Sequence, residues 1–98
     1  MVSTPYTRGR YSEYQTLKIL RSDGWLCTRS AASHSPVDII ACKDGNVLFV
    51  QVKSGKARIT QNDRLQLSEW KQASGGNVEI WFFGRKKGIE KEVIPENT

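Results

Sequence analysis

Three polar residues interrupt an apolar stretch of this sequence, and their types suit them to hold a divalent metal ion beside a phosphate. Residues 37–53 read VDIIACKDGNVLFVQVK, in which Asp38, Gln51 and Lys53 stand among aliphatic neighbours. A carboxylate and an amide carbonyl are oxygen ligands of the kind that magnesium prefers. An ammonium group can orient or activate a water molecule, or stabilise charge on a phosphate. Together these groups are typical of a site for phosphodiester hydrolysis.

A β-hairpin is expected to bring the three residues together. Asp44-Gly45 is typical of a two-residue type I′ turn, since both positions need a positive φ. With this turn, Asp38 lies directly opposite Gln51. Because side chains alternate along a strand, Asp38, Gln51 and Lys53 are expected on one face. The hairpin is apolar on both faces, which indicates a central strand pair, where polar groups are costly unless they satisfy one another or hold a ligand.

Helices are expected on either side of this hairpin. The first runs from Ser12, its N-cap, to Asp23-Gly24, and its inward stripe consists of Tyr14, Leu17 and Leu20, with Glu13 on the same side. The second starts after a capping box formed by Thr60 and Asp63, and points Leu67, Trp70 and Ala73 inward. Glu13 can therefore reach the hairpin site as a further carboxylate.

Further strands complete a three-layer α/β domain with a central mixed sheet flanked by helices. They are expected at residues 25–28, 78–83 and 89–94, which gives the order αβββαβ with a possible final β. Residues 1–10 are expected to form a flexible basic arm, and residues 95–98 a frayed tail. The whole chain, 1–98, is expected to be a single domain.

Composition excludes several classes of protein. The sequence shows no signal-peptide pattern and no apolar run of about 18 residues, so an intracellular protein without a membrane segment is expected. Cys27 and Cys42 are too few for a disulfide framework or a zinc site. The formal net charge of +5 favours a polyanionic partner such as nucleic acid.

The ordered set of motifs resembles the PD-(D/E)xK nuclease superfamily, and within it the archaeal-type Holliday junction resolvases. The resemblance covers roughly residues 8–83 and includes Gly9 and Glu13 in GRYSE, Gly24, Ala32 and Ser33, Asp38–Ala41, the Lys43 to Gly45 turn, Lys53-Ser54 and Ser74–Gly76. It implies a restriction-endonuclease-like fold. It also implies a homodimer that resolves four-way DNA junctions as a magnesium-dependent endonuclease.

The resemblance assigns roles to individual residues. Mg²⁺, for which Mn²⁺ is expected to substitute, would be held by Asp38, Gln51 and the backbone carbonyl of Val52. Glu13 would be an essential acid that completes the site by holding a second metal ion, a metal-bound water or Lys53, and Lys53 would lie near the nucleophilic water. Ser33 would sit on a mobile loop near the scissile phosphate, where it can donate a hydrogen bond.

Gln51 departs from the superfamily pattern, which places an acid at this position. An amide keeps the oxygen ligand but removes one negative charge, so weaker metal binding is expected. Mrr-like restriction nucleases resemble this sequence in carrying Q-x-K. Two alternatives therefore stay open: a restriction- or repair-type nuclease that acts on duplex, flap or nicked DNA, and a non-catalytic protein that binds junctions.

Basic residues on either side of the site are candidates for contacts with DNA phosphates. They are Arg8, Arg10, Lys56 and Arg58. Contacts of this kind supply sequence-independent, salt-sensitive affinity. The alternative is a surface whose charges serve solubility alone.

Overall fold

A tight turn at Asp44-Gly45 organises the centre of the sheet. In this computed structural model, Asp44 and Gly45 have φ angles of 51° and 80°. These positive values are those of the predicted type I′ turn. The turn joins β2 (Ile39–Lys43) to β3 (Asn46–Ser54). Their antiparallel register runs from Lys43 opposite Asn46 to Ile39 opposite Val50, which confirms the predicted pairing.

The hairpin forms the middle of a five-stranded mixed sheet with the order β1-β2-β3-β4-β5. β1 (Leu26–Arg29) is antiparallel to β2, β4 (Asn77–Arg85) is parallel to β3, and β5 (Gly88–Val93) is antiparallel to β4. The parallel pair requires a crossover, which helix α2 (Gln61–Ser74) provides. The predicted mixed sheet and the optional final strand are thus both present.

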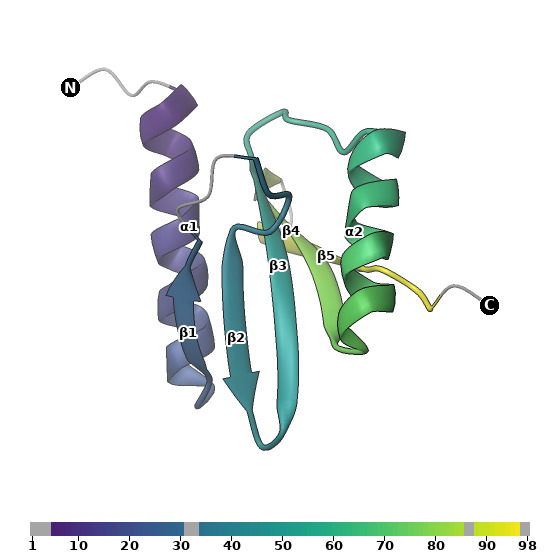
Figure 1. Ribbon diagram of the computed structural model, residues 1–98. Coiled ribbons are helices and arrows are strands. Elements are labelled where there is room, and N and C mark those ends of the chain that lie inside the picture. Colours follow the sequence, from purple (N-terminus) through teal and green to yellow (C-terminus); the bar gives the residue numbers. More distant parts are fainter. Residues whose placement is uncertain (1–4, 31–33, 86–87, 97–98) are drawn as a thin grey trace.

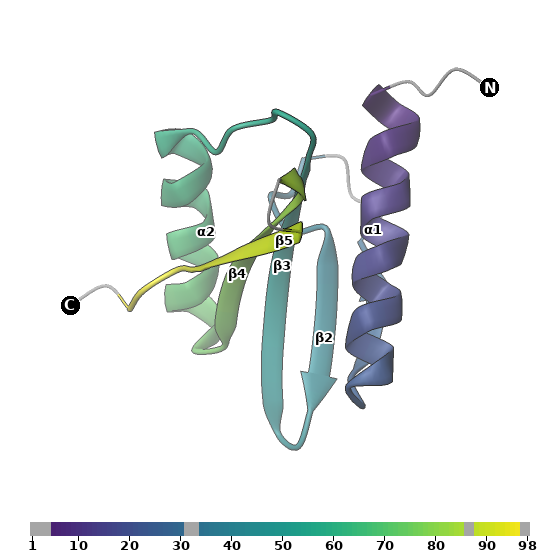
Figure 2. The same ribbon diagram turned by 180° about the vertical axis from the view of Figure 1, so that it is seen from behind.

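Two helices cover opposite faces of this sheet, as Figures 1 and 2 show from the two sides. Helix α1 (Pro5–Ser22) packs Leu17 and Leu20 against the face that carries Ile39 and Val50. Helix α2 packs Leu67 against the other face, in a cluster with Phe49, Val78 and Ile80. The expected three layers are confirmed.

Both helices begin at the end of the sheet where β3 ends (Figure 1). Consequently the first turns of α1 and α2 and the last residues of β3 lie at one rim of the molecule. The structure describes residues 5–30, 34–85 and 88–96. Within these ranges, neither helix combines the length and the apolar character that crossing a bilayer requires.

The start of α1 corrects one prediction. Residues 5–10 belong to the helix rather than to a flexible arm, and Ser12 is a buried mid-helix residue rather than an N-cap. Proline is favoured at the first helical position because its fixed φ suits the helix and its missing N–H is not needed there. Pro5 therefore marks the beginning that was expected at Ser12.

Two predicted core residues are also wrong. Tyr14 is 53% exposed, and the buried side of α1 consists of Ser12, Thr16, Leu17 and Leu20. The Thr16 hydroxyl is compatible with this burial because it donates a hydrogen bond to the Ser12 carbonyl at 2.8 Å. In α2, Ala73 is exposed.

The start of α2 agrees with its prediction in detail. The Asp63 N–H donates to Thr60 Oγ1 and the Thr60 N–H donates to Asp63 Oδ2, both at 3.0 Å. This reciprocal pair is the predicted capping box. Gly75, with φ of 68°, ends the helix in the left-handed conformation.

Candidate active site

Asp38 is held firmly at the rim although β2 begins one residue later. Its backbone N–H donates to the Val50 carbonyl at 2.8 Å, and its carbonyl accepts from the Ser30 N–H at 2.7 Å. Its carboxylate Oδ2 accepts the Val52 N–H at 2.7 Å. Within the described residues, Oδ2 is the carboxylate oxygen of Asp38 that accepts a hydrogen bond, which leaves Oδ1 for a ligand.

The environment of Asp38 opposes its ionisation. The pKa of its carboxyl group is raised to about 6, chiefly by burial and in addition by the nearby negative charge of Glu13. The Val52 amide and the positive charges of Lys53 and Arg29 act in the opposite direction. A carboxyl group in this position gains from a cation that would replace its lost hydration.

Gln51 supplies a second oxygen beside Asp38. Val50 pairs with Ile39, and one step further along the ladder Gln51 is next to Asp38. The Gln51 side chain is buried, with 7% of the residue exposed, and among the described residues its Oε1 atom has no hydrogen-bond partner. Leaving a buried acceptor unsatisfied costs about 1–3 kcal/mol. A hydrogen-bond donor or a bound cation would therefore stabilise this oxygen, and the described residues provide neither.

Lys53 lies two residues beyond Gln51 and reaches toward α2. Its Nζ atom is 3.6 Å from Asp63 Oδ2, and the two side chains are 21% and 23% exposed. Its charge also acts on Asp38, whose pKa it lowers. The Lys53 ammonium group thus forms an ion pair with Asp63 and also acts electrostatically on Asp38.

Glu13 approaches from the other face of the sheet. Its Oε1 atom lies 3.6 Å from the Arg29 guanidinium, which belongs to the end of β1. The effect of Glu13 on the pKa of Asp38 shows that the two acids are electrostatic neighbours. Glu13, Asp38, Gln51 and Lys53 are therefore assembled at one rim by α1 and the hairpin.

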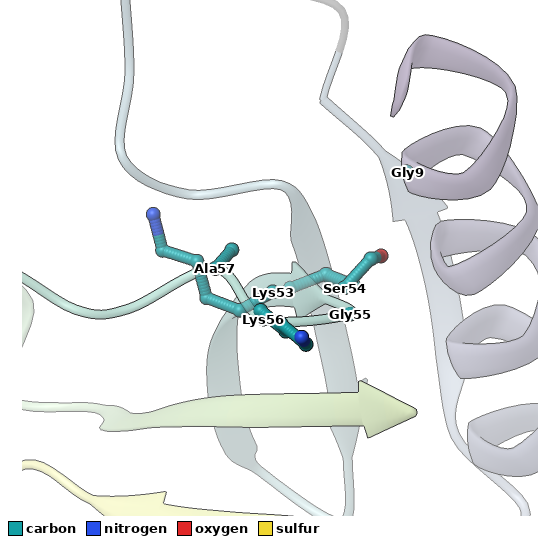
Figure 3. Close-up of a pocket in the computed structure, with 7 residues that line it drawn as sticks. Gly9, Lys53, Ser54, Gly55, Lys56 and Ala57 are labelled. Carbon is teal, nitrogen blue, oxygen red and sulfur yellow. The ribbon is translucent and has the colours of Figure 1, made fainter. Parts of the chain in front are cut away.

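A cavity of about 380 Å³ opens beside Lys53. It is lined by Gly9 of α1 and by the end of β3 and the segment after it, residues 52–57. Figure 3 shows Ser54 pointing toward α1, across from Gly9. Lys56 lines this cavity, while Arg10 and Arg58 are exposed. Ser33 and the side chain of Arg8 lie outside the described part of the chain.

Two contacts of the site were not anticipated from the sequence. Arg29, the partner of Glu13, is the last residue of β1, and nothing in its local sequence marks it. Asp63, the partner of Lys53, was expected only as a helix-capping residue. Their charges were visible in the sequence, but the partners they face depend on how the helices pack.

The donor set fits a magnesium-class ion, with a modest intrinsic affinity. Asp38 offers a carboxylate oxygen and Gln51 offers an unpartnered amide oxygen. In the part of the chain that the structure describes, no group of three histidine, cysteine or acidic side chains is arranged to hold a metal. Mg²⁺ commonly uses one or two carboxylates and completes its shell with water and substrate phosphate.

Two comparisons with known proteins bear on the family and the fold of this chain. The sequence model of the archaeal Holliday junction resolvase family (Hjc) matches residues 4–97. The fold is similar to the solved structure of Hjc, a Holliday junction resolvase from the archaeal hyperthermophile Archaeoglobus fulgidus, with a TM-score of 0.74. The two sequences are 20% identical, and the match covers 88% of this chain and 72% of that chain. At this identity the structural match shows a shared fold.

Proposed function

Because the chain belongs to the archaeal Holliday junction resolvase family, whose members are structure-selective junction-resolving nucleases, we propose that it cuts four-way DNA junctions by Mg²⁺-dependent hydrolysis at the site around Asp38. The unpartnered oxygen of buried Gln51, beside the anchored Asp38 carboxylate, carries this proposal. Both oxygens are suited to the same cation. Mn²⁺, which accepts similar oxygen ligands, would substitute for Mg²⁺.

Each residue of the site has a role in this reaction. Asp38, Gln51 and the carbonyl of Val52 would hold the ion, which when bound would stabilise the charge that develops on the scissile phosphate. Lys53 orients the attacking water in line with the leaving oxygen and offsets negative charge. Glu13 adds a second carboxylate next to Asp38.

Basic residues around the rim would position the DNA. Arg8 and Arg10 in α1, with Lys56 and Arg58 after β3, are proposed to contact phosphates on either side of the scissile bond. Ser33 is proposed to donate a hydrogen bond to a phosphate. Binding through such contacts releases counterions, so junction affinity should fall steeply as salt is raised.

A homodimer is part of the proposal. A four-way junction is nearly two-fold symmetric, and a symmetric dimer would present two sites to strands of like polarity. Light scattering of the purified protein tests this, with a mass twice that of the 98-residue chain as the expected result.

The decisive experiment follows the cleavage of a labelled four-way junction during a titration with Mg²⁺. Duplex and flap DNA of equal length are the reference substrates. Paired incisions near the branch point that require Mg²⁺ and vanish in Asp38→Asn support the proposal. Equal cutting of duplex or flap DNA would instead indicate a restriction- or repair-type nuclease.

A non-catalytic junction-binding protein is the second candidate, and the amide at position 51 is the observation that favours it. Tight junction binding without cutting in Mg²⁺ or Mn²⁺ would support this candidate. The Gln51→Glu variant then shows the cause: cutting that appears in this variant would mean that the missing charge alone prevents catalysis.

A further inference from the structure

The ion pair between Lys53 and Asp63 joins the proposed catalytic lysine to the first turn of α2. We propose that Asp63 is a positioning residue, which holds the Lys53 ammonium at the distance from Asp38 that catalysis needs. This inference rests on the proposed function, since it assumes the role of Lys53 given above.

Asp63 is itself fixed by two local hydrogen bonds. Its backbone N–H donates to Thr60 Oγ1, and its Oδ2 atom accepts the Thr60 N–H, both at 3.0 Å. The same Oδ2 atom faces Lys53 Nζ at 3.6 Å. A lysine side chain is flexible and carries its charge as a compact ammonium group at its end. The capping box thus holds the Asp63 carboxylate in a fixed position, where it can restrict the position of the Lys53 ammonium.

Asp63 also keeps its negative charge under ordinary conditions. The hydrogen bond from the Thr60 backbone lowers the pKa of Asp63, and the charge of Lys53 acts in the same direction. An anion at this place competes with Asp38 for the ammonium group, since Lys53 acts electrostatically on both carboxyl groups. Without the charge of Asp63, Lys53 would be attracted to Asp38 alone. Its ammonium group would then bind the Asp38 carboxylate oxygen that the metal needs.

Position, rather than stability, is the expected contribution of this pair. Partly exposed ion pairs contribute little to folding. A small displacement of a catalytic group, in contrast, can reduce a rate by up to about 100-fold. The effect of Asp63 should therefore appear in the cleavage step and in the Mg²⁺ concentration required for it.

Four variants in one junction assay test the inference. Asp63→Asn removes the charge and keeps an oxygen for the Thr60 N–H, whereas Asp63→Glu keeps both the charge and a residue suited to capping. Thr60→Ala removes the hydroxyl that accepts the Asp63 N–H, but keeps the charge of Asp63 and the backbone N–H that holds its carboxylate. Lys53→Ala removes the proposed catalytic group. Each variant is measured for melting temperature, junction affinity without metal, and single-turnover cleavage across a Mg²⁺ titration.

Asp63→Asn should cut about 10- to 100-fold more slowly, require more Mg²⁺, and bind the junction normally. Asp63→Glu should recover most of the rate, and Thr60→Ala should lose melting temperature but little activity. Wild-type cutting by Asp63→Asn, with Lys53→Ala inactive, would overturn the inference and leave the proposed function intact. Equal losses in Asp63→Asn and Thr60→Ala would also overturn it, because helix stability would then explain both. Normal cutting by Lys53→Ala would remove the role of Lys53 and the inference together.

Discussion

The two flanks of the site hold charges of opposite sign by different means. On the α1 flank, Glu13 faces Arg29 at 3.6 Å, and on the α2 flank Lys53 faces Asp63 at the same distance. Arg29 is supported by contacts with Tyr14, through a hydrogen bond of 3.5 Å and a guanidinium-to-ring distance of 5.7 Å. Asp63 is supported instead by the hydrogen bonds of its own helix cap.

This difference separates a flank built by tertiary packing from one built by local sequence. Glu13 reaches the site only because α1 packs on the sheet, and its partner Arg29 comes from an edge strand. Asp63 is placed by the three-residue spacing of a capping box. Asp38 lies between the flanks, and both affect its pKa. The predictions below test whether the site depends on the two flanks unequally.

The largest effect is expected when the cation of the α2 flank is removed. Lys53→Ala should lower single-turnover cleavage by at least about 1,000-fold, because an oriented charge at the reacting phosphate is lost. Junction affinity should change little, since many basic residues share the phosphate contacts. Lys43→Ala, at the far end of the hairpin, is the matched control and should cut normally. If Lys53→Ala lost junction affinity while Lys43→Ala kept it, the role of Lys53 would be DNA binding instead.

A smaller effect is expected on the α1 flank. Glu13→Gln keeps the shape of the side chain and removes its charge, and should lower cleavage by about 100-fold, near the upper end of effects seen for groups that support metal ligands. Glu69→Gln, on the exposed surface of α2, serves as control. The measurement is the single-turnover rate at saturating Mg²⁺. A loss larger than that of Lys53→Ala would reverse the proposed order of the two flanks.

The two flanks also differ in how far the sequence could predict them. The hairpin register and the cap of α2 follow from turn and capping residues within a few positions, and both are confirmed. The start of α1 differs from its prediction because the sequence offers two start signals, Ser12 and Pro5, and the helix begins at Pro5. The partners of Glu13 and Lys53 could not be predicted, since long side chains choose partners only after the helices have packed. The catalytic roles themselves remain predictions.

Removing the carboxylate between the flanks should stabilise the metal-free protein at neutral pH. The pKa of folded Asp38, about 6, exceeds its ordinary value of 3.8. The contribution of Asp38 to folding stability is therefore fully present below pH 3.8, where its carboxyl group is protonated. It is lost as the pH rises through 6, where the buried group ionises. The stability of Asp38→Asn relative to wild type should thus increase by about 3 kcal/mol between pH 3.5 and pH 8.

Urea unfolding in the presence of a chelator measures this difference. Asp44→Asn, which removes an exposed carboxylate from a turn position that Asn tolerates, is the control. An unchanged difference between the Asp38→Asn variant and wild type across this pH range would mean that burial does not perturb Asp38. The site would then have less reason to attract a cation.

The smallest effect is expected at the seam that joins α1 to the end of β3. Ser54 Oγ donates a hydrogen bond to Ser12 Oγ at 2.7 Å, one residue after Lys53 (Figure 3 shows the orientation of Ser54). Ser54→Ala should lower the free energy of unfolding by about 1 kcal/mol. Cleavage should fall less than in Asp63→Asn, because this bond orients the backbone and leaves the charge partner of Lys53 in place. A larger loss of cleavage in Ser54→Ala would mean that packing against α1, rather than the cap of α2, determines where the Lys53 ammonium lies.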